Sequence, residues 1–170
     1  MKTHKMFKAI IVLLLCISYS ACSDPNPLYV SGLEGKTLPN YTLILKDSIT
    51  QFRTEDIKKG DPFFLIFYQP NCPHCQAEIK AITSHIEKFN DIKFYLITSF
   101  PFPLIKQFSN YFDLSKYTNV VLVRDSASKM LTYFNAPGVP FIASYNRDKI
   151  LNKTFLGECD IDDLLNSIRH

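Results

Sequence analysis

The stretch that decides the fold is residues 63–75, FFLIFYQPNCPHC. Its first six residues form a continuous aromatic and aliphatic run, which has the length and composition of a strand buried on both faces. Apolar residues then recur at positions 79, 82, 86 and 89, which is the spacing of an amphipathic helix. The sequence therefore predicts a pair of thiols, Cys72 and Cys75, where a central strand gives way to a helix.

This position makes the two thiols chemically different. The thiolate is the reactive form of cysteine, and the unpaired backbone N–H groups at a helix start stabilise negative charge. Cys72 lies near the predicted helix tip, so we expect it to be acidic and exposed, and to be the attacking thiol. Cys75 projects to the centre of the apolar helix face, and we expect it to be the shielded thiol that resolves a mixed disulfide.

Length and composition indicate one globular domain. The chain has 170 residues, of which 46% are hydrophobic and 21% are charged. Its net charge of +3 depends on Lys2, Lys5 and Lys8, because removing these three of the 19 basic residues leaves 16, against 16 acidic residues. A neutral mature chain gives no support for nucleic-acid binding. We expect a monomer.

The first 21 residues have the character of a targeting signal. A Lys-rich start precedes an uncharged run from residue 9 to residue 21, which is shorter than the ~18 residues needed to span a bilayer. Residues 19–22, YSAC, resemble a bacterial lipoprotein cleavage box with Tyr19 in place of the usual Leu. That resemblance implies a lipidated Cys22 at the new N-terminus and a membrane-anchored protein on the periplasmic side. The alternative is ordinary cleavage after Ser20 or Ala21, which releases a soluble periplasmic protein.

Export would allow disulfide chemistry, because the cytosolic systems that keep thiols reduced are left behind. We expect a signal peptide over residues 1–21, a tether over 22–34 and the folded domain over 35–170. That domain holds Cys72, Cys75 and Cys159, which are too few for a disulfide-stapled scaffold. We expect Cys159 to be a buried or incidental free thiol, and a third redox cysteine is the minor alternative.

The rest of the chain alternates between strand and helix patterns. Strand, helix and strand around the dithiol indicate a parallel crossover, and the last third indicates a hairpin followed by a helix that Asp160 can cap. Residues 54–60 predict one or two helical turns with Thr54 as N-cap. The predicted strands cover 41–45, 63–68, 92–98, 120–123, 141–145 and 150–156, and the predicted helices cover 73–89, 104–112, 127–134 and the segment after 160.

These features together resemble the thioredoxin fold. The resemblance rests on Cys72 and Cys75 at a helix start, on residues 138–140 (GVP), on the hairpin and on the final helix. More narrowly, the export signal, residues 38–41 (LPNY) and Glu78 resemble the membrane-tethered TlpA/ResA-type thiol–disulfide oxidoreductases. The expected fold is α/β: a thioredoxin fold with a central mixed β-sheet flanked by helices and an N-terminal extension.

The resemblance also implies roles for particular residues. In this family the proline that matches Pro140 is cis and lies against the dithiol, so Val139 and Pro140 are expected to hold the substrate chain. Glu78 lies at the margin of the buried helix face, where its carboxylate could accept the proton of Cys75. The alternative for Glu78 is a solvated surface acid.

Two features depart from the TlpA/ResA pattern. Asn71 stands where that family has Trp, so a substrate-facing aromatic is missing. Pro73 and His74 form the dipeptide typical of DsbA-type oxidants. An imidazole near a thiolate favours the reduced form, and this raises the reduction potential. The family likeness and Glu78 favour a reductant, whereas His74 favours an oxidant.

Other chemistries fit the two cysteines less well. A structural zinc site needs four ligands, and haem attachment needs a histidine where Gln76 stands. A peroxidase would have threonine at position 69, which is Gln69. A dithiol carrier of Cu(I) is the rival from another class. We therefore expect an exchange enzyme that needs no bound cofactor or metal and acts on protein thiols, protein disulfides and a redox donor or acceptor.

Overall fold

The computed structural model describes residues 27–168. The expected signal peptide, Cys22 and the start of the expected tether lie outside the described residues. Within residues 27–168, no helix combines the length and the apolar character that crossing a bilayer requires.

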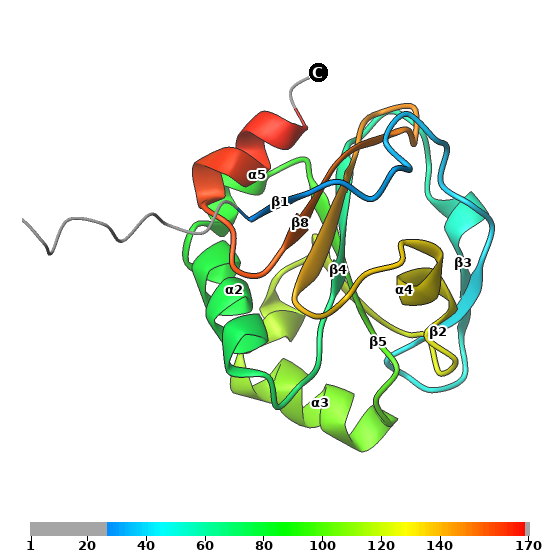
Figure 1. The fold of residues 1–170 in the computed structure, drawn as a ribbon. Helices are drawn as coiled ribbons and strands as arrows, with labels where there is room; N and C mark the ends of the chain where they lie inside the picture. Colours follow the sequence, from blue (N-terminus) through cyan, green and yellow to red (C-terminus); the bar gives the residue numbers. More distant parts are fainter. Residues whose placement is uncertain (1–26, 169–170) are drawn as a thin grey trace, which may run out of the picture.

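One mixed sheet forms the centre of the domain (Figure 1). Its eight strands lie in the order β1-β8-β7-β4-β5-β6-β2-β3. The strands are β1 Leu28–Tyr29, β2 Thr42–Leu45, β3 Gln51–Arg53, β4 Phe63–Phe67, β5 Lys93–Thr98, β6 Val120–Arg124, β7 Phe141–Tyr145 and β8 Leu151–Leu156. This arrangement confirms the predicted mixed sheet.

The predicted apolar strand is the central one. All five residues of β4 are buried, and the strand pairs with β5 in parallel and with β7 in antiparallel orientation. A strand with a neighbour on each side and packing on both faces has to be apolar along its whole length, as residues 63–67 are. The parallel pairing of β4 with β5 confirms the predicted crossover through the helix that follows the dithiol.

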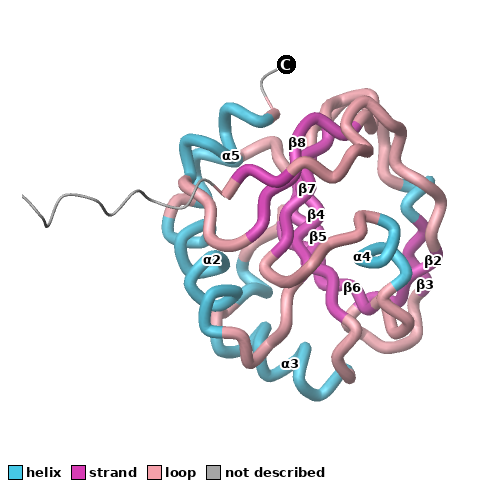
Figure 2. The backbone as a smooth tube through the Cα atoms, in the orientation of Figure 1, coloured by secondary structure: helices cyan, strands magenta, loops and turns pink. Residues whose placement is uncertain are grey.

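Helices cover the sheet on both sides, as Figures 1 and 2 show, with α2 and α3 on one side and α4 on the other. The helices are α2 Pro73–Ser84, α3 Phe102–Tyr111, α4 Lys129–Tyr133 and α5 Ile161–Ser167, and short 3-10 turns are formed by Thr54–Asp56, Ile86–Phe89 and Leu114–Lys116. The predicted helix over residues 73–89 is therefore interrupted at His85, whose backbone leaves the helical region. Asp160 precedes α5 as predicted, although its side chain makes no capping hydrogen bond.

The alternation of β4 side chains divides the core into two clusters. Phe64 and Ile66 pack beneath α2 and α3, in the same cluster as Cys75. Phe63 and Leu65 belong to the opposite cluster, which α4 and the N-terminal segment cover. Successive strand residues point to opposite faces, so one apolar strand supplies both cores.

Two short strands were not predicted from the sequence. The segment expected to be a tether up to residue 34 contains β1, which pairs with β8 at one sheet edge, so the ordered domain begins before residue 35. The second missed strand, β3, pairs with β2 at the other edge. Strands of two and three residues have too little alternation to be recognised from a sequence pattern.

The expected N-cap role of Thr54 is wrong in its details. Arg53 occupies the N-cap position, and Thr54 is buried within the 3-10 turn. The Thr54 hydroxyl donates a hydrogen bond to the Pro39 carbonyl at 2.7 Å and accepts one from the Tyr41 N–H at 2.8 Å. Its side chain thus ties the turn to the segment before β2 instead of capping a helix.

Candidate active site

Cys72 lies at the N-cap of α2, directly after the loop that leaves β4. Its sulfur accepts a hydrogen bond from the Cys75 N–H at 3.3 Å, so a backbone donor of the first helical turn points at it. The side chain is partly exposed. The structure therefore places Cys72 at a helix tip and within reach of a second molecule, as the sequence predicted.

Cys75 lies one turn further on and is buried, with 1% of its surface exposed. Burial and the hydrogen-bonding interaction with Cys72 raise the pKa of the Cys75 thiol to about 12. A thiol with such a pKa stays protonated at neutral pH, so it needs a base before it can attack. Cys72 and Cys75 are free thiols in the structure.

Pro73 occupies the first position of α2, where a proline fits because its missing N–H would have no partner in the helix. His74 follows it on the surface. The His74 Nδ1 lies 2.7 Å from Glu158 Oε1, on the loop between β8 and α5. This contact joins two residues that are 84 positions apart in the sequence.

The Val139–Pro140 peptide bond is cis and lies beside the dithiol. The Cys72 thiol contacts the Val139 carbonyl oxygen at 3.9 Å, and Val139 packs against both core clusters. The Pro140 carbonyl accepts a hydrogen bond from the Gly157 N–H at 2.8 Å. The structure thus brings Val139, and the peptide bond that it shares with Pro140, against Cys72.

Glu78 is buried, with 1% of its surface exposed, so the alternative of a solvated acid does not hold. Its Oε2 accepts a hydrogen bond from the Cys159 N–H at 2.8 Å, and its Oε1 has no hydrogen-bond partner among the described residues. Burial, opposed by the Cys159 hydrogen bond and assisted by the charges of Glu158 and Asp160, raises the pKa of Glu78 to about 7. A carboxyl group with this pKa can take up and release a proton at neutral pH.

Cys159 is a buried free thiol, as expected. Burial and the neighbouring Glu78 carboxylate raise the pKa of this thiol. Its contribution to the site is its backbone N–H, which no property of a cysteine side chain could have indicated. Glu158 was also missed, because nothing in its local sequence shows that it meets His74.

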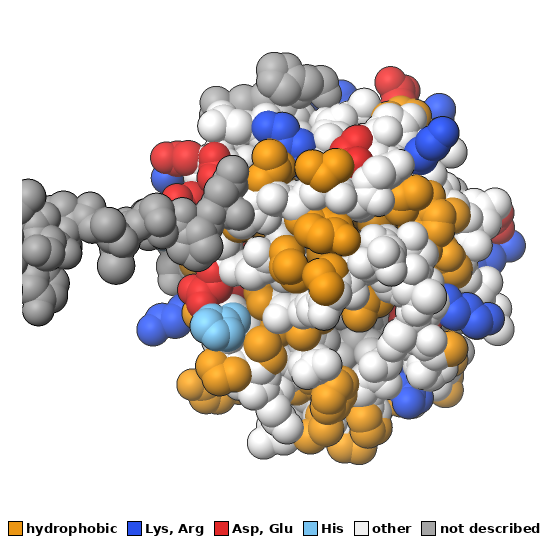
Figure 3. Space-filling model, in the orientation of Figure 1, with side chains coloured by type: hydrophobic (Ala, Val, Ile, Leu, Met, Phe, Trp, Pro, Cys, Tyr) orange, Lys and Arg blue, Asp and Glu red, His pale blue; other side chains and the backbone are white. Residues whose placement is uncertain are grey.

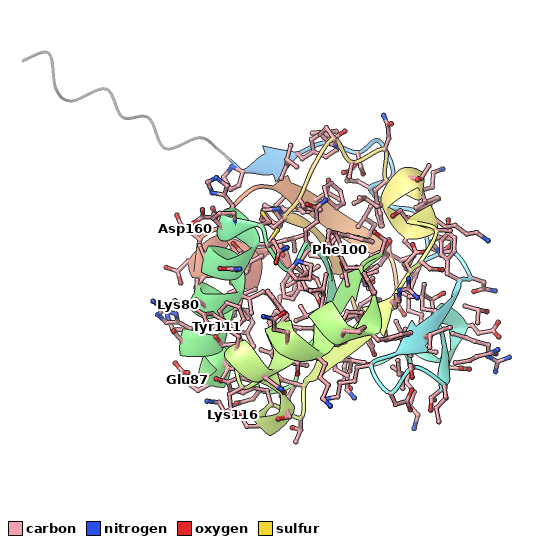
Figure 4. The ribbon with its side chains drawn as sticks, turned by 90° about the horizontal axis from the view of Figure 1, so that it is seen from below. Lys80, Glu87, Phe100, Tyr111, Lys116 and Asp160 are labelled. Atoms are coloured by element: carbon pink, nitrogen blue, oxygen red, sulfur yellow. The ribbon has the colours of Figure 1, made fainter. Side chains whose placement is uncertain are left out.

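A cavity of about 220 Å³ opens beside Asn71, the residue that stands in place of the Trp of the TlpA/ResA pattern. Asn71 and Gln76 line it on the dithiol side, and Leu104, Phe108 and Tyr111 of α3 line the other. Tyr111 is 76% exposed and is seen at the surface of α3 in Figure 4. An aromatic side chain from α3 therefore lies on the same cavity as Asn71.

Metal ligands are not gathered in the described part of the chain. Within residues 27–168, no group of three or more His, Cys, Asp or Glu side chains is arranged to hold a metal ion.

Comparison with known proteins identifies the architecture. Residues 35–110 match the model of the AhpC/TSA family. Among solved structures, a secreted Mycobacterium tuberculosis disulfide oxidoreductase homologous to Escherichia coli DsbE superposes with a TM-score of 0.63 at 19% identity, over 75% of this chain and 92% of that one. The chain has a thioredoxin-like fold.

Two further structures share this thioredoxin-like fold. StoA from Bacillus subtilis has a TM-score of 0.58 at 17% identity, over 76% of this chain and 96% of its own. A yeast mitochondrial 1-Cys peroxiredoxin has a TM-score of 0.64 at 12% identity, over 78% and 72% of the two chains. A search of curated proteins gives no sequence match.

Proposed function

We propose that this thioredoxin-like protein is a thiol–disulfide oxidoreductase that acts on protein substrates. The observation that carries the proposal is the asymmetry of the dithiol. Cys72 is accessible at the tip of α2 with the Cys75 N–H directed at its sulfur, whereas Cys75 is buried one turn behind it. This is the arrangement that an attacking thiol and a resolving thiol require.

In the reducing direction, the Cys72 thiolate attacks one sulfur of a substrate disulfide. A Cys72–substrate disulfide forms while the substrate disulfide breaks, and the other substrate sulfur leaves with the electron pair. Cys75 then attacks Cys72, which releases the second substrate thiol and leaves a Cys72–Cys75 disulfide. No external cofactor is needed, because the dithiol supplies both electrons.

Glu78 is proposed to accept the Cys75 proton during the second step. A thiol with a pKa of about 12 releases its proton only as the new S–S bond forms, and a buried carboxyl with a pKa of about 7 is partly ionised and able to receive it. In the oxidising direction Glu78 returns the proton. The free Oε1 of Glu78 leaves one oxygen available for this exchange.

Val139 and Pro140 are proposed to hold the substrate chain beside Cys72. Support comes from the contact of the Cys72 thiol with the Val139 carbonyl, which places this backbone next to the reacting sulfur. The surface also suits a protein substrate. Figure 3 shows hydrophobic side chains gathered over the middle of one face, with charged side chains mostly at its rim.

We propose reduction as the direction of transfer and the extracytoplasmic side of a bacterial membrane as the location. When the His74 ring is protonated, the Glu158 carboxylate compensates its positive charge, and this weakens the reason to expect an oxidant. The location rests on the N-terminal signal-like sequence, with Cys22 as the proposed lipid anchor, and a relative in fold is described as secreted.

The test is the reduction potential of the Cys72–Cys75 couple, measured by equilibration with glutathione, together with the rate of insulin reduction. A reductant should have a potential nearer to about −270 mV than to about −120 mV. The Cys72→Ser variant should lose insulin reduction completely, and the Cys159→Ser variant should keep it. Copper that copurifies with a protein lacking exchange activity would contradict the proposal and favour the Cu(I) carrier.

A further inference from the structure

Three consecutive residues of the loop between β8 and α5 contact three residues of the proposed active site. The Gly157 N–H donates a hydrogen bond to the Pro140 carbonyl. The Glu158 side chain contacts His74, and the Cys159 N–H donates a hydrogen bond to Glu78. Asp160, the next residue, lies beside α2 in Figure 4. This loop therefore contacts both His74 and Glu78, the two groups near the dithiol that could carry protons.

The contact of His74 with Glu158 determines which ring nitrogen is free. A carboxylate can only accept a hydrogen bond, so at 2.7 Å the His74 Nδ1 must donate its hydrogen to Glu158 Oε1. In a neutral imidazole the other nitrogen, Nε2, is then an unprotonated acceptor. The His74 side chain is 74% exposed, so Nε2 is open to an approaching molecule.

We propose that Glu158 and His74 form a dyad that carries the proton of the substrate thiol, with His74 as the catalytic residue and Glu158 as its positioning residue. The inference rests on the proposed exchange function and extends it to the step between the two molecules. Its basis is the hydrogen bond that fixes Nδ1, the exposure of the ring, and the place of His74 between the two cysteines.

The proton balance of this step is simple. When the Cys72 thiolate attacks the substrate disulfide, the leaving substrate thiolate takes the Nε2 proton of the His74 imidazolium and departs as a thiol. His74 remains neutral, with its Nδ1 hydrogen still bonded to Glu158. In the reverse direction, Nε2 takes the proton of the substrate thiol that attacks the substrate sulfur of the Cys72–substrate disulfide, and the Cys72 thiolate leaves as the substrate disulfide forms.

The dyad divides the proton transfers between two sides of the dithiol. His74 handles the proton of the substrate sulfur on the surface, and Glu78 handles the proton of Cys75 in the interior. Each of the two groups is held by one residue of the pair Glu158 and Cys159, 2.7 Å and 2.8 Å away. A substitution at Glu158 should therefore slow the intermolecular step and leave the Cys75 step almost unchanged.

The first test is the tautomer of His74, read from the ¹⁵N chemical shifts of its ring in full-length protein that carries Cys16→Ser and Cys22→Ser. Above the pH at which the ring loses its charge, the unprotonated nitrogen should be Nε2. Glu158→Ala should shift the population toward the opposite tautomer. Glu158→Gln keeps an acceptor oxygen and should preserve the original tautomer, and Glu87→Ala, an exposed acid outside the loop, should change nothing. An Nε2–H tautomer in the unsubstituted protein would overturn the dyad.

The second test is the rate at which reduced protein attacks oxidised glutathione, followed in a single turnover. His74→Ala should slow this step about tenfold, below the usual range for acid–base catalysis because thiolates leave readily. Glu158→Ala should slow it by a smaller factor, Glu158→Gln should restore most of the rate, and Glu158→Ala should add nothing to His74→Ala.

The outcomes separate the two proposals. Additive effects of the two substitutions, or rate changes fully accounted for by a change in reduction potential, would overturn the dyad while exchange itself remains established. Failure of the unsubstituted protein to react with oxidised glutathione and to reduce insulin would instead overturn the proposed function.

Discussion

The backbone N–H of Cys159 lies 2.8 Å from Glu78 Oε2 and donates a hydrogen bond to it, although the two residues are 81 positions apart in the sequence. The bond gives a buried carboxyl one fixed oxygen and leaves the other oxygen without a partner among the described residues. A carboxyl in this setting is costly to ionise, and the cost appears both in the stability of the fold and in its chemistry.

Glu78 should make the fold less stable as the pH rises. Its folded-state pKa of about 7 is above the value near 4.5 of an unfolded chain, mainly because of burial. Between these two values the folded state binds more protons, so the free energy of unfolding falls by about 3 kcal/mol from pH 4.5 to pH 7 and is level above that range. Urea unfolding at several pH values measures this slope.

The Glu78→Gln variant is the matched test of this slope. Glutamine keeps an acceptor oxygen for the Cys159 N–H and carries no charge, so most of the pH dependence should disappear. The exposed Glu87→Gln variant should retain it. An unchanged slope in Glu78→Gln would show that Glu78 is not the titrating group.

The three thiols of the domain should react with iodoacetamide at very different rates. Cys72 is partly exposed, whereas Cys75 and Cys159 are buried and burial raises the pKa of both. At pH 8 we expect Cys72 to be alkylated at least about tenfold faster than the other two, as measured by mass spectrometry. Denaturant should remove the difference. Equal rates in the folded protein would contradict the asymmetry of the pair.

Tyr68 should be replaceable by phenylalanine without loss of stability. Its ring packs against Phe108 with centroids 4.6 Å apart, but its buried hydroxyl has no hydrogen-bond partner among the described residues. Removing an unsatisfied buried polar group should raise the free energy of unfolding by up to about 1 kcal/mol. The exposed Tyr111→Phe variant is the control and should have no effect. A clear loss of stability in Tyr68→Phe would mean that the hydroxyl is satisfied.

Thr54 should be intolerant of valine despite the similar shape of the two side chains. Its buried hydroxyl makes two hydrogen bonds, to the Pro39 carbonyl and from the Tyr41 N–H. Thr54→Val leaves both backbone groups without their partner and should cost about 2 kcal/mol in thermal or urea unfolding. Thr54→Ser should recover most of this loss. If the valine and serine variants were equally stable, the two hydrogen bonds of the hydroxyl would not contribute to stability as the structure indicates.

Local patterns were enough to predict the parts of the fold that depend on neighbours in sequence. The apolar run of β4, the helical spacing after Cys72 and the hairpin of β7 and β8 all appear where their residues indicated. The edge strand β1 and the role of Thr54 were not predicted, because each depends on a partner segment far away in the sequence.

The same distinction applies to the site. The structure brings Cys72, Cys75, Val139 and Pro140 together, and sequence spacing and family resemblance had singled these out. The burial of Glu78 was left open, because a helix-wheel position at the edge of the apolar face does not tell which segment will cover it. The Cys159 backbone meets it from a segment 81 positions away in the sequence, and no local pattern shows this.

The most direct test of the central claim is the site of the mixed disulfide. Reduced Cys75→Ser protein should be incubated with a disulfide-bonded peptide, and the covalent product should be mapped by mass spectrometry. The account predicts that the peptide is attached to Cys72 and that the Cys72→Ser variant captures none at Cys75. A product on Cys75 or Cys159, or no product while Cys72 is intact and reduced, would contradict it.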